Sequence, residues 1–128
     1  MLDFENTRAK GNHGEQLALN YLVKQSLILV EQNVSSRYGE IDIVMRDGEE
    51  WVFVEVRLRR SQVFGGGLES VTRSKQRKLI NTAEYYIQKH HKTHFEDCRF
   101  DIIEISGTLE EPIINWIKDA FWADYVAL

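Results

Sequence analysis

The stretch GEIDIVMRDGEEWVFVEVR, residues 39–57, decides the fold of this chain. Apolar and polar residues alternate on both sides of Asp47-Gly48, a pair that is common in tight turns. The pattern predicts a β-hairpin with strands over residues 39–46 and 51–59. This hairpin is expected to supply the centre of a sheet.

The register of the hairpin decides which side chains meet. We expect residues 47–50 to form a four-residue loop, so that Arg46 pairs with Trp51. Asp42 then lies opposite Glu55, with the two Cβ atoms about 4.5–5.5 Å apart. Carboxylates that close repel each other unless a cation lies between them, and hard oxygen ligands suit Mg²⁺ or Mn²⁺.

The same register places other residues of the hairpin. Glu40 is expected opposite Arg57 on the face of the carboxylates, whereas Ile41, Ile43 and Met45 share the opposite face of their strand. The alternative to a metal site is a solvent-facing polar surface, on which Glu40 and Arg57 form an ordinary cross-strand ion pair. The choice depends on the loop length, since a two-residue loop is expected to break this register.

The rest of the chain predicts further helices and strands. Apolar periodicity indicates helices over residues 7–24 and 74–90, and strands over residues 27–34 and 99–106. Pro112 suits the start of a helix, and the apolar spacing of Ile113, Trp116, Ile117, Ala120 and Phe121 predicts a final amphipathic helix. The expected order is α-β-β-β-α-β-α. This is an α/β fold, a mixed sheet flanked by helices, in one domain over residues 1–128.

Charged residues give a second indication of function. Glu15 lies on the apolar stripe of the first helix, where an ionised acid needs a partner or a metal. The net charge is −4, yet seven basic residues and one acid lie between Arg57 and Lys78. This run predicts a positively charged face that binds the phosphates of nucleic acid. The residues expected to bind are Arg59, Arg60, Arg73, Lys75, Arg77 and Lys78.

Composition excludes a membrane protein and a disulfide scaffold. The longest aliphatic run, residues 27–30, is far shorter than the roughly 18 residues that span a bilayer, so we expect no membrane partner. The single cysteine, Cys98, has no intrachain partner for a disulfide. A reducing, cytoplasmic location is therefore expected.

Five segments together resemble a known family. They are Gly14-Glu15, residues 39–44 (GEIDIV), residues 52–57 (VFVEVR), Gly65-Gly66 followed by Ser70-Val71-Thr72 and Lys75, and residues 99–103 (RFDII). In this order and spacing they resemble the YraN-like uncharacterised protein family over residues 8–107. That family is similar to the restriction-endonuclease-like nuclease superfamily, and it is usually likened to the archaeal Holliday-junction resolvases.

The resemblance implies a nuclease fold and site. The superfamily has an α-β-β-β-α-β core, with an acid on the first helix, an aspartate on the second strand and Glu-x-Lys on the third. It implies that Glu15, Asp42 and Glu55 bind Mg²⁺ or Mn²⁺. The backbone carbonyl of Val56 would be a further ligand of the same ion. It also implies cleavage of DNA, at branched structures such as junctions, by a homodimer.

One position departs from the superfamily pattern. Arg57 replaces the lysine of Glu-x-Lys, and because arginine stays protonated it cannot act as a base. Arg57 could still stabilise the transition state, or Lys75 could supply the ammonium. The third interpretation is a noncatalytic nucleic-acid-binding or adaptor module, and a purely protein-binding domain is a further alternative. Glu40 and Gln76 are expected to orient the site, although a satisfied amide in the core explains Gln76 equally well.

Overall fold

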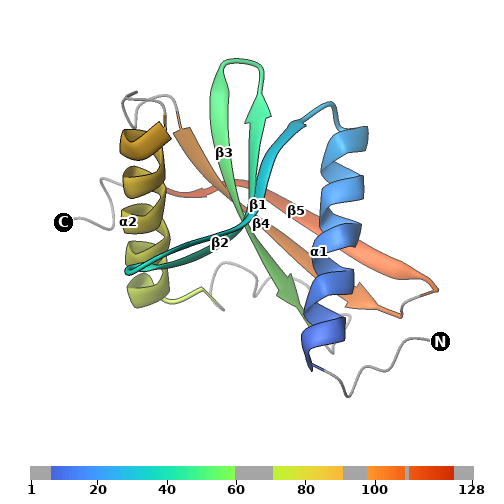
Figure 1. Cartoon of the computed structure of the whole chain (residues 1–128). Coiled ribbons are helices and arrows are strands. Elements are labelled where there is room, and N and C mark those ends of the chain that lie inside the picture. The colour runs from blue at the N-terminus through green and yellow to red at the C-terminus, as the bar shows by residue number, and fades with distance from the viewer. Residues whose placement is uncertain (1–6, 60–70, 91–97, 109, 123–128) are drawn as a thin grey trace.

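The computed structural model describes residues 7–59, 71–90, 98–108 and 110–122. A twisted five-stranded sheet lies between two helices (Figure 1). In chain order the elements are α1 (Thr7–Lys24), β1 (Ile28–Ser36), β2 (Gly39–Asp47), β3 (Glu50–Leu58), α2 (Arg73–His90), β4 (Cys98–Gly107) and β5 (Pro112–Phe121). The α/β class and the first six elements are as the sequence predicts, with ends that differ by at most two residues.

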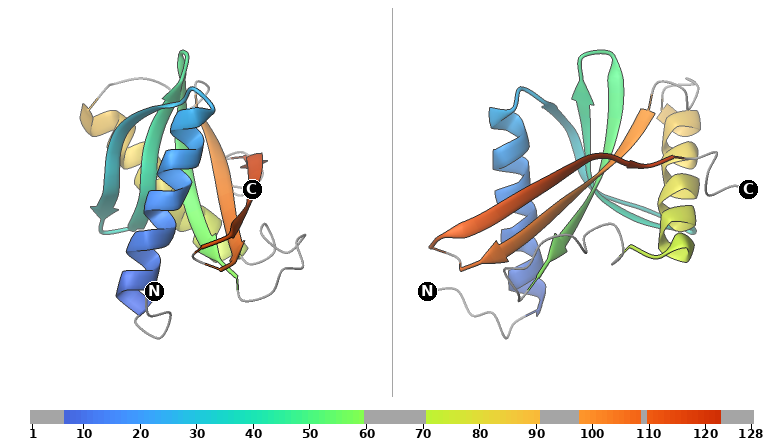
Figure 2. Two further views of the ribbon diagram at one scale, coloured as in Figure 1. Left: turned by 90° about the vertical axis from the view of Figure 1, so that its right-hand side faces the viewer. Right: turned by 180° about the vertical axis from the view of Figure 1, so that it is seen from behind.

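The sheet separates two hydrophobic cores. Its strand order follows the sequence, β1-β2-β3-β4-β5, and all neighbours are antiparallel except β3 and β4, which are parallel. α2 covers one face and α1 covers the other (Figure 2). Phe53 and Leu79 lie in the core beneath α2, whereas Leu22 and Val52 lie in the core beneath α1. Within the described residues, no helix is long and apolar enough to cross a membrane.

The hairpin of β2 and β3 has the predicted register but a shorter loop. Arg46 pairs with Trp51, as expected. Asp47 also pairs with Glu50, so the loop has two residues instead of four, and Gly48 adopts a positive φ of 62° that favours glycine. The expectation that a two-residue loop breaks the register is therefore wrong: the register is unchanged because each strand extends by one more residue.

The ladder between β2 and β3 ends at the pair Ile43–Val54. Beyond it, β2 pairs only with β1 and β3 pairs only with β4, so the two strands diverge (Figure 1). We call the opening between residues 39–42 of β2 and residues 55–58 of β3 the fork. At the fork, residues of β2 and β3 have no partner in each other's strand.

The fork corrects two expected pairs. Asp42 does not lie directly opposite Glu55 in the ladder; its carboxylate Oδ2 instead accepts a hydrogen bond from the backbone N–H of Val56, at 2.8 Å. Glu40 does not pair with Arg57 either, because the ladder has already ended at that point. The side chain of Asp42 therefore takes the place of a backbone partner at the mouth of the fork.

The alternation of side chains also breaks at the fork. Ile41 was expected to share a face with Ile43 and Met45, but it packs with Val44 in the core beneath α2. On the neighbouring strand β1, Asn33 adopts a left-handed conformation with φ of 53°. Asparagine tolerates this conformation better than most residues. The resulting twist turns this end of the β1–β2 hairpin toward α2.

The last element is a strand, so the predicted C-terminal helix is wrong. β5 pairs antiparallel with β4, and its β-branched and aromatic residues favour a strand. Phe100 pairs with Phe121 but Ile102 pairs with Ile117, so β5 bulges between them, at Asp119 with its φ of 55°. The bulge adds residues between neighbouring inward-facing positions of β5. The apolar residues are then spaced as they would be in a helix, although the segment is a strand.

The buried carboxylate of Asp101 on β4 stabilises this bulge through hydrogen bonds. It accepts hydrogen bonds from Trp116 Nε1 and from the backbone N–H of Asp119, both at 2.9 Å. Arg99 Nε lies 3.1 Å from the same carboxylate, and its Nη1 reaches Glu50 at 2.7 Å. Because Asp101 is fully buried, each of these donors offsets the cost of burying its charge.

Replacing Asp101 with alanine should lower the free energy of unfolding by about 3 kcal/mol or more, because Arg99, Trp116 and Asp119 lose a shared acceptor. Denaturant unfolding followed by circular dichroism measures the loss. The control is Glu110→Ala, in an exposed acid of the turn before β5, which should change stability by less than about 0.5 kcal/mol. Equal losses in the two variants would contradict this role of Asp101.

Candidate active site

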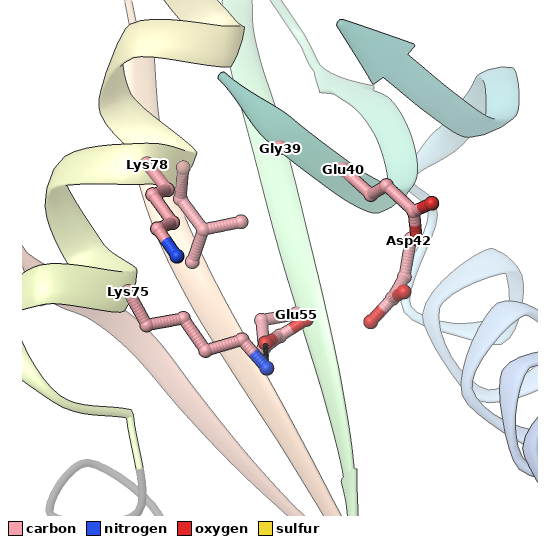
Figure 3. A pocket seen from close by; sticks show the side chains of 7 residues that line it. Gly39, Glu40, Asp42, Glu55, Lys75 and Lys78 are labelled. Atoms are coloured by element: carbon pink, nitrogen blue, oxygen red, sulfur yellow. Dashed lines mark ion pairs between the residues drawn. The ribbon is translucent and has the colours of Figure 1, made fainter. Parts of the chain in front are cut away.

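A cavity of about 220 Å³ occupies the fork (Figure 3). β2 and β3 form its floor, and the first two turns of α2 form its wall. The cavity brings acids and ammonium groups together, as the side chains in Figure 3 show. Its lining residues are Gly39, Glu40, Asp42, Glu55, Lys75, Lys78 and Leu79.

Three carboxylates from three elements meet at the mouth of the fork. Asp42 of β2 contacts both Glu55 of β3 and Glu15 of α1. The helix can come this close because Gly14 has no side chain: a Cβ there would lie only 2.6 Å from Leu58 Cδ2. The three acids that the sequence predicts are thus brought together, although they meet by the divergence of the strands and not by direct pairing.

Two of these acids, Asp42 and Glu15, have raised pKa values, mainly because they are buried. Burial raises the pKa of Asp42 to about 8, and the hydrogen bond and negative charge of Glu55 act in the same direction. The N–H of Val56 opposes this shift, since it favours the ionised form. Burial also raises the pKa of Glu15, whereas hydrogen bonds with Asp42 and Asn33 lower it. The cluster therefore disfavours a full set of negative charges unless a cation is present.

Asn33 contacts the acids of the site, although the sequence did not predict this contact. It lies on β1 in a left-handed conformation and bonds to the carboxylate of Glu15. An asparagine within a strand carries no distinctive signal by itself, because such residues usually point to solvent. Its hydrogen bond to Glu15, which sequence patterns do not display, identifies it as part of the site.

Lys75 is the cation nearest to the carboxylates. Its Nζ lies 2.7 Å from Glu55 Oε2, and Arg57 Nη1 lies 3.9 Å from the same oxygen. Glu55 itself is 5% exposed, so this pairing compensates a buried charge. Of the two cations that the sequence offers for the site, Lys75 makes the closer contact.

The start of α2 is fixed by short-range hydrogen bonds. Thr72 Oγ1 accepts from the backbone N–H of Lys75 at 3.2 Å, as an N-cap does. Gln76 Nε2 donates to the carbonyl of Val71 at 2.9 Å. Gln76 is therefore a satisfied buried amide that supports the helix start, and it does not line the cavity.

The remaining predicted basic residues lie in different surroundings. Lys78 lines the cavity, and Arg73 and Arg77 are exposed on α2. Arg59 turns inward, with Nη1 3.4 Å from Oε2 of the fully buried Glu104, so it is not a free surface cation. The expectations for Arg60 and for the glycine segment, residues 65–67, lie outside the described residues.

The donor atoms of the site are those that hard divalent cations prefer. Asp42 and Glu55 face each other, Glu15 adjoins Asp42, and Glu40 is exposed at the rim of the cavity. Among the described residues, no three acids, histidines or cysteines are placed so that together they could hold a metal ion without rearrangement. The group that fills the space nearest Glu55 is the ammonium of Lys75, and a cation bound between the acids would take over its neutralising role.

Known proteins match most of this chain, including the site. Residues 14–105 match the family described as "Uncharacterised protein family UPF0102". The UPF0102 protein lpg2994 of Legionella pneumophila is 47% identical over 115 residues, which cover 90% of this chain and 96% of the relative. A UPF0102 protein of Vibrio cholerae is 45% identical over 118 residues, which cover 91% of this chain and 95% of the relative. The chain therefore belongs to the uncharacterised protein family UPF0102.

Proposed function

We propose that this protein is a metal-dependent nuclease that hydrolyses phosphodiester bonds in DNA. The observation that carries the proposal is the meeting of Asp42, Glu55 and Lys75 in an open cavity, with Glu15 beside Asp42. The order of the first six elements, α-β-β-β-α-β, is that of the restriction-endonuclease-like core and supports the same reading. The exposed bases of α2 beside the cavity would bind phosphates that flank the cut.

Each side chain has a role in this proposal. Asp42 and Glu55 would hold a Mg²⁺ or Mn²⁺ ion, and Glu15 would assist through Asp42. Such an ion would supply an activated water and positive charge beside the phosphate oxygens. Lys75 moves its ammonium from Glu55 to a phosphate oxygen when the substrate enters, which stabilises the same charge. Arg57 adds a fixed positive charge but exchanges no proton.

A noncatalytic nucleic-acid-binding module is the second candidate. Arg57 stands at the position of the usual lysine, and Lys75 already neutralises Glu55 without any metal. The net charge of −4 also argues against binding by bulk charge alone. The two candidates differ in one respect, because only the nuclease requires a divalent ion and both central carboxylates.

The variants Asp42→Asn and Glu55→Gln should each lower the rate of DNA cleavage at least a hundredfold, since each loses a charged ligand. The assay uses labelled four-way-junction, flap, single-stranded and duplex DNA with Mg²⁺, Mn²⁺ or EDTA. Glu110→Gln, in an exposed acid outside the cavity, is the matched control and should cut like the unmodified protein. Metal-independent cutting, or full activity in either cavity variant, would refute the assignment.

Lys75 should matter more to cleavage than Arg57, because it lies closer to the carboxylates. We expect Lys75→Ala to reduce the cleavage rate about a hundredfold and Arg57→Ala less than tenfold. Single-turnover rates with saturating enzyme separate this effect from weaker binding. A larger loss of cleavage rate in Arg57→Ala than in Lys75→Ala would place the essential cation on β3 and not on α2.

A further inference from the structure

Two tyrosines with cations beside them form a partly exposed patch next to the cavity. Tyr38 lies in the turn between β1 and β2, and Tyr85 lies on α2. Their ring centroids are 6.4 Å apart and the ring planes meet at 62°. The guanidinium of Arg37 lies 4.9 Å from the ring centroid of Tyr38, and Lys89 Nζ lies 5.8 Å from that of Tyr85. We call these four residues the tyrosine platform.

The platform is partly exposed, because Tyr38 is half-buried and Tyr85 is exposed. Tyr85 is 44% exposed, whereas its neighbour Tyr86 is 4% exposed and belongs to the core. Arg37 and Lys89 are both exposed. The phenol oxygen of Tyr38 accepts a hydrogen bond of 2.7 Å from Arg37 Nη2, which fixes the guanidinium beside the ring. A partly exposed aromatic pair with two cations suits a ligand that combines a flat ring with phosphate.

The fold holds the platform at a defined place relative to the cavity. Ser36 donates a hydrogen bond to Thr82 Oγ1 at 3.2 Å, which fastens the β1–β2 turn to α2. Gly39, which follows Tyr38, lines the cavity, and so does Lys78 on α2. The platform therefore lies beside the cavity, on the turn and the helix that contribute Gly39 and Lys78 to its lining.

The spacing along α2 corresponds to a short length of nucleic acid strand. Lys75 and Tyr85 are ten residues apart, which is about 15 Å along a helix. Stacked nucleotides advance about 3.4 Å each along a strand. A strand with a phosphate beside Lys75 would therefore reach the platform about four nucleotides away, and Lys78 lies between the two positions.

We propose that the tyrosine platform stacks an unpaired base of the strand that enters the cavity, so that the substrate carries a single-stranded segment. The inference rests on the proposed nuclease function and names the substrate class of that site. Bases inside a duplex are stacked on both faces and are covered by their neighbours, whereas an unpaired base offers a free face to an aromatic ring. Arg37 and Lys89 hold the phosphates on either side of this base.

Binding measurements in EDTA test the platform without any cleavage. The probes are a single strand with one 2-aminopurine and a blunt duplex of the same sequence, at one fixed salt concentration. Tyr85→Ala should weaken binding of the single strand about tenfold and abolish the fluorescence change of 2-aminopurine. Its affinity for the duplex should change less than twofold. Tyr85→Phe, which keeps the ring, should bind the single strand like the unmodified protein.

The control removes an exposed aromatic side chain that lies outside the platform. Trp122 is 60% exposed and lies outside the platform, so Trp122→Ala should leave single-strand binding unchanged. Equal effects of Tyr85→Ala on single strand and duplex, or none on either, would overturn the inference. Metal-dependent cleavage in a protein that fails this test would leave the nuclease proposal intact. Platform-dependent binding without any cleavage would keep the inference and favour the noncatalytic module.

Discussion

The candidate site depends on one constraint, the end of the β2–β3 ladder at Ile43 and Val54. Because the strands diverge there, the N–H of Val56 lacks a strand partner on the β2 side and is satisfied by the carboxylate of Asp42. β1 and β4 hold the two arms of the fork in place, and the arms leave a cavity that α2 borders. A continuous ladder would have paired Asp42 with Glu55 directly and would have left no space for a substrate between the strands.

Holding the acids in this fork has a cost, which the rest of the fold offsets. Burial and mutual repulsion disfavour the ionised form of Asp42, while Lys75 neutralises Glu55 and Asn33 bonds to Glu15. The supporting structure is well packed, with a hydrophobic core on each face of the sheet. This combination of a rigid scaffold and a strained cluster of charges is typical of functional sites.

The sequence predicts the hairpin register, both helices and the three acids because these depend on local alternation and periodicity. It misjudges features that depend on irregular backbone. The bulge at Asp119 gives the residues of β5 the apolar spacing of a helix, so the strand is mistaken for one. The twist beside Asn33 moves Ile41 to the other face. The contact of Asp42 with Val56 follows from divergence of the strands, which alternation alone does not reveal.

The most direct test is the pH dependence of stability, with and without Mn²⁺, in the unmodified protein and in Asp42→Asn. Folding raises the pKa of Asp42 from its ordinary value of 3.8 to about 8, so its contribution to stability is complete below about pH 4 and is lost as the pH rises through 8. Relative to the variant, the metal-free protein should therefore lose stability between pH 4 and 8. Mn²⁺ at pH 8 should restore it, with little effect on the variant. Identical pH profiles, together with no difference in the response to Mn²⁺, would contradict a cation site in the fork.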